Sequence, residues 1–152
     1  MLDGSVIFWS GGLLVGPISN NTGSLLTHVA IVFDDIVYEA TPPKVRKLKL
    51  SSYQTHLQQL SRSGFWQRRN FSWFNMQPIV AYTTSELEAM LAYAESQLGR
   101  PYRLRGWWSN DLRGIFCSQY VGNVIEKSGR IRSLDNRESP GSLHKKLRGL
   151  YV

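Results

Sequence analysis

The spacing of hydrophobic residues changes along the chain between a period of two and a helical period, which predicts a mixed α+β fold. Five short runs rich in β-branched and aromatic residues are predicted as strands: residues 5–9, 27–33, 36–41, 44–50 and 78–82. The fourth run is basic and follows Pro42-Pro43. We expect it at a sheet edge, where lysines discourage unwanted pairing.

Helical spacing dominates elsewhere. Residues 52–60 carry Tyr53, Leu57 and Leu60 on one face, which leaves His56 on the surface. The clearest helix follows Ser85-Glu86-Leu87-Glu88, interpreted as a capping box, and ends at Gly99. A last short segment begins at residues 139–143, with His144 expected at the surface.

The only cysteine lies where a further helix is predicted to begin. Tyr120, Val121, Val124 and Ile125 follow Phe116 at helical spacing, so Cys117 falls in the first turn. The free N–H groups and positive dipole end of a helix N-terminus stabilise a thiolate, as a nucleophile requires. A lone cysteine is also commonly a small buried hydrophobic residue, and position alone leaves both interpretations open.

A hairpin is predicted where Asp34-Asp35 separates two of the strands. A two-residue turn would pair Ala30 with Glu39 and His28 with Thr41, so that His28 and Glu39 share one face as diagonal neighbours. A slip of one residue would send Glu39 to the opposite face. Each residue taken alone is more simply an ordinary strand residue, but an imidazole, a carboxylate and a thiol together are the parts of an acyl-transfer site.

Composition narrows the class of protein. The chain has 152 residues, which suits a single domain spanning 1–152. One cysteine excludes an internal disulfide, and the three scattered histidines lack metal-binding spacing, so we expect neither a metal nor another cofactor. No signal peptide or membrane-spanning segment is visible, which favours a cytoplasmic protein or one delivered by a phage or host.

The net charge of +7 favours an anionic partner or surface. Nucleic acid, phospholipid and an acidic wall polymer all fit this charge, and nucleic acid is not favoured among them. Residues 65–74 interleave aromatic residues with arginines. Such a segment can stack on bases or contact lipid, but we favour a strand with its turn, because aromatic residues are ordinary strand formers.

Several short stretches resemble the circularly permuted branch of the NlpC superfamily, which comprises papain-like cysteine hydrolases called YiiX-like and related to lecithin:retinol acyltransferases. The similar stretches, in chain order, are Val6-Ile7-Phe8, Thr27-His28-Val29-Ala30-Ile31, Tyr38-Glu39-Ala40, Leu98-Gly99-Arg100-Pro101-Tyr102, Phe116-Cys117-Ser118-Gln119-Tyr120-Val121 and Ser139-Pro140-Gly141-Ser142-Leu143. Each motif is short, but six in the same order span nearly the whole chain. Asp3-Gly4 replaces an opening Gly-Asp, and Arg103 stands where relatives often carry Asp; these departures bear on the substrate class.

The resemblance implies a permuted papain-like fold, with an antiparallel sheet packed against the helix that bears the nucleophile. It implies Cys117 as nucleophile, His28 as base and Glu39 as the group that orients His28. The backbone N–H of Cys117 would contribute to an oxyanion hole. Tyr102, Ser118 and Trp107 are the residues expected to bind substrate.

The expected function is a cysteine hydrolase that cleaves an amide or isopeptide bond through a thioester acyl-enzyme, with peptidoglycan stem peptides as the substrate suggested by the resemblance. One alternative is a lipid or thioester acyltransferase, with Phe65-Trp66 and Trp107-Trp108 as lipid contacts. Another is a non-catalytic protein that binds a polyanion through its positive surface.

Overall fold

The computed structural model describes residues 1–11, 25–64, 71–103, 114–132 and 139–152. The strands are β1 (Val6–Ser10), β2 (Leu26–Phe33), β3 (Ile36–Thr41), β4 (Lys44–Lys49) and β5 (Ser72–Met76). The helices in this part of the chain are α2 (Leu50–Arg62), α4 (Thr84–Ser96), α5 (Cys117–Glu126) and α6 (Pro140–Leu147). The predicted α+β class is therefore confirmed.

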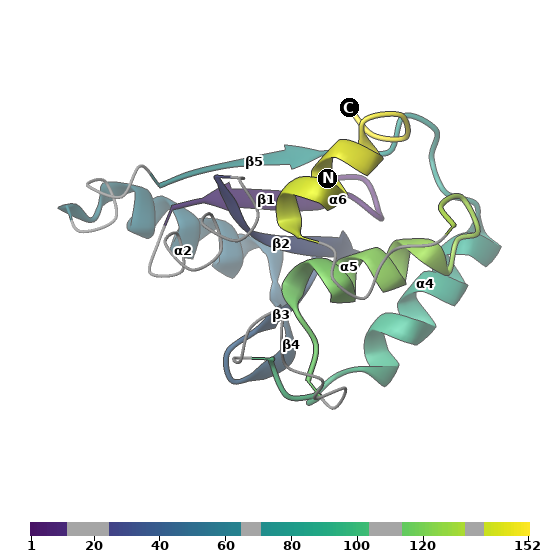
Figure 1. The fold of residues 1–152 in the computed structure, drawn as a ribbon, viewed down its shortest axis with the longest axis horizontal. Coiled ribbons are helices and arrows are strands. Elements are labelled where there is room, and N and C mark those ends of the chain that lie inside the picture. The colour runs from purple at the N-terminus through teal and green to yellow at the C-terminus, as the bar shows by residue number, and fades with distance from the viewer. Residues whose placement is uncertain (12–24, 65–70, 104–113, 133–138) are drawn as a thin grey trace.

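The strands form one five-stranded antiparallel sheet in the order β4-β3-β2-β1-β5 (Figure 1). The basic strand β4 lies at one edge, as its lysines predicted. The strand expected within residues 65–74 is β5 at the other edge, although residues 65–70 lie outside the described part of the chain.

The turn between β2 and β3 has the expected two residues. Asp34 and Asp35 have positive φ angles of 47° and 54°, as a type I′ hairpin turn requires. The backbone N–H of Asp34 donates to the carboxylate of Asp3 at 2.7 Å. Phe33 pairs with Ile36, which confirms the predicted register at the turn.

The hairpin opens sooner than the sequence predicted. β2 and β3 pair only from Phe33–Ile36 to Ile31–Tyr38, and the expected pairs of Ala30 with Glu39 and His28 with Thr41 do not form. β3 and β4 turn away from the rest of the sheet, and α5 begins beside the opening (Figure 1). Hydrophobic alternation sets which face a residue occupies, but it does not show where two strands separate.

Helices cover both faces of the sheet. On one face, α2 packs its buried residues Leu50, Tyr53 and Leu57 against alternate residues of β1, β2 and β3. On the other face, α5 packs against β2 and β3, with α4 alongside it and α6 against β2 (Figure 1). As expected, the sheet is packed against the helix that bears the cysteine. This helix, α5, is buried along nearly its whole length.

Two sequence predictions need correction. The capping box of α4 is formed by Thr83 with Glu86, two residues before the predicted Ser85. Residues 78–82 form no strand. Pro78 makes a single bridge with Tyr151, and Ile79 and Val80 are 58% and 65% exposed. A proline cannot donate to a β-ladder, and apolar composition alone could not show that this segment lies outside the sheet.

Candidate active site

Cys117 is the first residue of α5, as the sequence predicted. Phe116 precedes it in an extended conformation, with φ −84° and ψ 161°, and is the N-cap residue. The approach to the helix is fixed by backbone hydrogen bonds: the N–H of Ile115 donates to the carbonyl of Pro101 at 3.0 Å, and the N–H of Arg103 donates to the carbonyl of Ile115 at 3.2 Å. The nucleophile candidate therefore lies on a braced element rather than a free loop.

The His28 side chain connects Cys117 to Glu39. Its Nε2 lies 2.7 Å from Glu39 Oε2, and its ring also interacts with the nearby Cys117 side chain. Burial by itself lowers the pKa of an imidazole, but the hydrogen bonds and charges of Cys117 and Glu39 outweigh burial and raise the pKa of His28 to about 9. The three residues implied by the resemblance thus meet in the order thiol, imidazole, carboxylate.

Glu39 is held by more partners than His28. The Arg46 guanidinium donates to Oε1 through Nε at 2.8 Å and Nη2 at 2.7 Å, and the Tyr53 hydroxyl donates to Oε2 at 3.2 Å. Burial raises the pKa of a carboxyl group, but His28 and Arg46 lower the pKa of Glu39 to about 2. Glu39 is 1% exposed and carries a negative charge at neutral pH.

Two aromatic residues adjoin this chain of contacts. Burial, together with interaction with the nearby Cys117 side chain, raises the pKa of Tyr102 well above its ordinary value, so its hydroxyl keeps its proton and can donate. The Trp9 ring meets the His28 ring edge to face, with centroids 4.8 Å apart, from the paired position on β1. The Trp9 ring therefore restricts the orientation of the imidazole.

The three residues expected to bind substrate differ in where the structure places them. Tyr102 lies close enough to Cys117 to interact with its side chain. Ser118 is buried, with 1% exposure, in the first turn of α5. Trp107 lies outside the described residues. Their roles in substrate binding stay predictions.

Tyr53, Arg46 and Trp9 also belong to the site, and the sequence carries a signal for the first two of them. Arg46 lies directly opposite Glu39 in the β3–β4 ladder, where opposite charges pair favourably. Tyr53 was placed on a buried helix face, and a buried tyrosine hydroxyl usually has a partner. Trp9 gave no such signal, because its approach to His28 depends on the pairing of distant strands.

The other two histidines, His56 and His144, were both expected at the surface and not in the site. His56 is exposed on α2, which confirms its prediction. His144 is half-buried rather than at the surface, with its ring 5.4 Å from Phe8 and 5.5 Å from Phe74 between ring centroids. Docking of α6 on the sheet covers it, which local sequence did not show.

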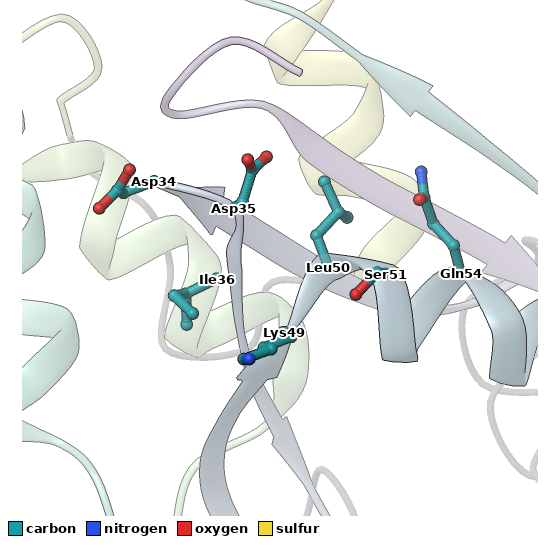
Figure 2. Close-up of a pocket in the computed structure, with 7 residues that line it drawn as sticks. All are labelled: Asp34, Asp35, Ile36, Lys49, Leu50, Ser51 and Gln54. Atoms are coloured by element: carbon teal, nitrogen blue, oxygen red, sulfur yellow. The ribbon is translucent and has the colours of Figure 1, made fainter.

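A separate pocket of about 400 Å³ lies at the tip of the β2–β3 hairpin and the start of α2. Figure 2 shows its lining side chains, with Asp34, Asp35 and Ile36 from the hairpin and Lys49, Leu50, Ser51 and Gln54 from the other side. None of the proposed catalytic residues lines this pocket.

Within the described ranges, no three or more His, Cys, Asp or Glu side chains are grouped so that they could hold a metal ion. Both oxygens of Glu39 are already engaged by Arg46, Tyr53 and His28. The described residues therefore do not fit a bound metal. No helix in the described part of the chain is long and apolar enough to span a bilayer.

Comparison with known proteins supports the fold. The chain is similar to the crystal structure of the metalloprotein yiiX from Escherichia coli O157:H7, with a TM-score of 0.63 and 18% sequence identity. The similarity covers 97% of this chain and 81% of that one. No protein-family model and no curated protein sequence matches the chain. The protein therefore has a YiiX-like α+β fold.

Proposed function

We propose that the protein is a cysteine-dependent acyl hydrolase that cleaves an amide or isopeptide bond. The observation that carries this proposal is the His28 imidazole, which interacts with the Cys117 side chain and is hydrogen-bonded at 2.7 Å to the buried Glu39 carboxylate. A nucleophile, a proton-transfer group and an orienting group in this order are the requirements of covalent acyl transfer.

In the proposed reaction the Cys117 sulfur, its proton held by His28, attacks the substrate carbonyl carbon and forms a tetrahedral adduct. His28 then gives its proton to the leaving nitrogen, the carbon–nitrogen bond breaks, and a thioester to Cys117 remains. Water deprotonated by His28 attacks the thioester carbon, the carbon–sulfur bond breaks, and the acid is released together with the Cys117 thiolate. Glu39 holds the imidazole in place and stabilises its positive charge throughout.

The start of α5 supports stabilisation of the negative oxygen in this reaction. The backbone N–H groups of Cys117 and the next residues are those of a first helical turn, which have no partner within the helix. The positive end of the helix dipole favours both a thiolate and an oxyanion. The Tyr102 hydroxyl supplies one further donor at the sulfur.

Peptidoglycan stem peptides are the proposed first substrate to test, because the net charge of +7 attracts an anionic polymer. The alternatives have less support. The aromatic pairs suggested as lipid contacts lie outside the described residues. In the basic group on β4, Arg46 is paired with Glu39 and Lys47 with Glu95, so part of this charge is already neutralised within the protein.

The test compares purified wild-type protein with Cys117→Ala, His28→Ala and the control His56→Ala on muropeptides and on model amides and thioesters. We expect product only with wild type and His56→Ala, and a thioester mass adduct on Cys117 in wild type. The hydrolase proposal fails if wild type leaves every bond intact and its thiol reacts with iodoacetamide no faster than a free cysteine.

A further inference from the structure

Arg103 is a buried cation without a counter-ion among the described residues. Arg103 is only 8% exposed, and its Nε and Nη2 atoms have no hydrogen-bond partner. The described ion pairs involve other residues. Because arginine keeps its proton in proteins and an unpaired buried charge is costly, this arrangement favours binding of an anion.

The position of Arg103 is tied to the nucleophile. Its guanidinium carbon lies 4.9 Å from the ring centroid of Phe116, the residue that precedes Cys117. Its backbone N–H is bonded to Ile115, and the residue before it, Tyr102, reaches the Cys117 side chain. Gly114 packs so closely that a Cβ there would lie 3.0 Å from the Arg103 Cα. The cation is therefore braced against the segment that delivers Cys117.

The two unpartnered nitrogens form a specific shape. Nε and Nη2 lie on one edge of the planar guanidinium, and their N–H bonds point the same way. Such an edge binds a carboxylate or phosphate through two parallel hydrogen bonds. The guanidinium carbon lies over the Phe116 ring, and this cation–π contact restricts the position of the group.

We propose that the Nε and Nη2 edge of Arg103 binds a carboxylate or phosphate group of the substrate, so that the acyl substrate of Cys117 is anionic close to the attacked carbonyl. This inference rests on the proposed function for its substrate, but the anion site itself does not require catalysis. It assigns Arg103 a role in substrate selection rather than in the chemical step.

If Arg103 had a purely structural role, its N–H groups would be expected to have acceptors within the protein. An arginine that served only to pack on Phe116 would have its N–H groups satisfied by carbonyls or carboxylates of the protein, as is usual for buried polar atoms. Even the half-exposed Arg46 has both its Nε and its Nη2 bonded to a carboxylate, that of Glu39. Arg103 has the same kind of edge with no acceptor.

The first experiment uses two small electrophiles of similar shape, iodoacetate and iodoacetamide. Each forms a bond from the Cys117 sulfur to the methylene carbon with loss of iodide, but only iodoacetate carries a carboxylate. We expect the ratio of the iodoacetate rate to the iodoacetamide rate to fall roughly 10- to 100-fold in Arg103→Gln, as for loss of a charged hydrogen bond. The control Arg62→Gln removes an exposed arginine on α2 and the same net charge, and its ratio should equal that of wild type.

If Arg103→Gln does not fold, the same rate ratio is measured with Arg103→Lys. It keeps the positive charge but cannot present two parallel donors, so the ratio should still fall. An unchanged ratio in folded Arg103 variants overturns the proposal. So does an equal fall in Arg62→Gln, because the effect would then come from overall charge.

A second measurement separates this site from the proposed activity. Thermal unfolding is followed with increasing acetate, malonate or inorganic phosphate at constant ionic strength. Stabilisation of wild type and Arg62→Gln, absent in Arg103→Gln, supports the anion site even if Cys117 proves unreactive, in which case the hydrolase proposal alone fails. Equal stabilisation of all three proteins overturns the site. The more effective of the carboxylates and phosphate identifies the group that the substrate carries.

Discussion

Glu39 shows how a buried carboxylate can be kept ionised and immobile. Its two oxygens accept hydrogen bonds from Arg46, Tyr53 and His28, which come from β4, α2 and β2. Because these partners favour the charged form, the pKa of Glu39 falls to about 2 despite burial. The result is a fixed negative charge directly behind His28.

Replacing Glu39 by Gln is expected to lower the pKa of His28 from about 9, because burial then acts with less opposition. Turnover should fall roughly 10²-fold or more, since the proton-transfer group loses its orientation and charge support. The measurement is a titration of the His28 ring signals by NMR. Glu95→Gln is the matched control, because Glu95 pairs with Lys47 at the surface and should leave the titration of His28 unchanged.

The same two pKa shifts predict how stability depends on pH. The pKa of His28 is raised from 6.5 to about 9, so its contribution is complete below about pH 6.5 and is lost as the pH rises through 9. The pKa of Glu39 is lowered from 4.5 to about 2, so its contribution is present above pH 4.5 and is lost as the pH falls through 2. Urea unfolding should show greatest stability between pH 4.5 and 6.5, with a shallower alkaline decline in His28→Gln. An equal alkaline decline in wild type and variant would contradict the assignment.

At the scale of elements, the start of α4 depends on one threonine. The Thr83 hydroxyl accepts from the N–H of Glu86 at 3.3 Å, while the Glu86 carboxylate accepts from the N–H of Thr83 at 2.7 Å. Arg130 also bonds to this carboxylate, with Nη2 2.6 Å from Oε2, which ties the helix start to the segment after α5. The helix therefore begins before the first apolar residue of its stripe.

Thr83→Ala should destabilise the protein by about 1 kcal/mol, the usual effect of losing an N-cap side chain. Ser85→Ala is the control, since exposed Ser85 bonds only to the Thr83 hydroxyl among its described side-chain contacts and should cost less than 0.5 kcal/mol, roughly the scatter of surface substitutions. Midpoints of urea unfolding measure both. A larger loss of stability in Ser85→Ala than in Thr83→Ala would contradict the cap at Thr83 and favour the cap predicted at Ser85.

Across the whole molecule, the two ends of the chain are joined. The Tyr151 hydroxyl donates to the carbonyl of Gly4 at 2.9 Å and lies 2.8 Å from the Tyr82 hydroxyl. Backbone hydrogen bonds also connect Gln77 with Val152 in both directions. Figure 1 shows both termini on the same side of the molecule, near the end of β5.

Tyr151→Phe should lower the free energy of unfolding by about 1–3 kcal/mol, because the Gly4 carbonyl and Tyr82 hydroxyl lose a buried partner. Tyr82→Phe removes the same hydrogen bond between the Tyr82 and Tyr151 hydroxyl groups by deleting the Tyr82 hydroxyl. The double variant should lose less stability than the sum of the single variants, since both remove the same hydrogen bond. Strict additivity would show that the two hydroxyl groups are not coupled.

The sequence alone determined the local features that lead to the site. Helical spacing after Phe116 placed Cys117 in a first turn, and alternation around Asp34-Asp35 placed His28 and Glu39 on adjacent strands. Each of these inferences depends only on residues close in the chain, where side-chain period and turn chemistry act directly. The cap of α4 was misplaced by two residues because several polar residues compete for that position.

Only the tertiary structure decided what the site residues contact. The early separation of β2 from β3, the bonds from Tyr53 and Arg46 to Glu39, and the burial of Arg103 beside Phe116 join elements that are distant in sequence. Such contacts follow from how helices pack on the two faces of the sheet, and no local pattern encodes that packing. The sequence therefore identified the chemical groups, and the packing of the sheet and its helices decided their partners and their charge states.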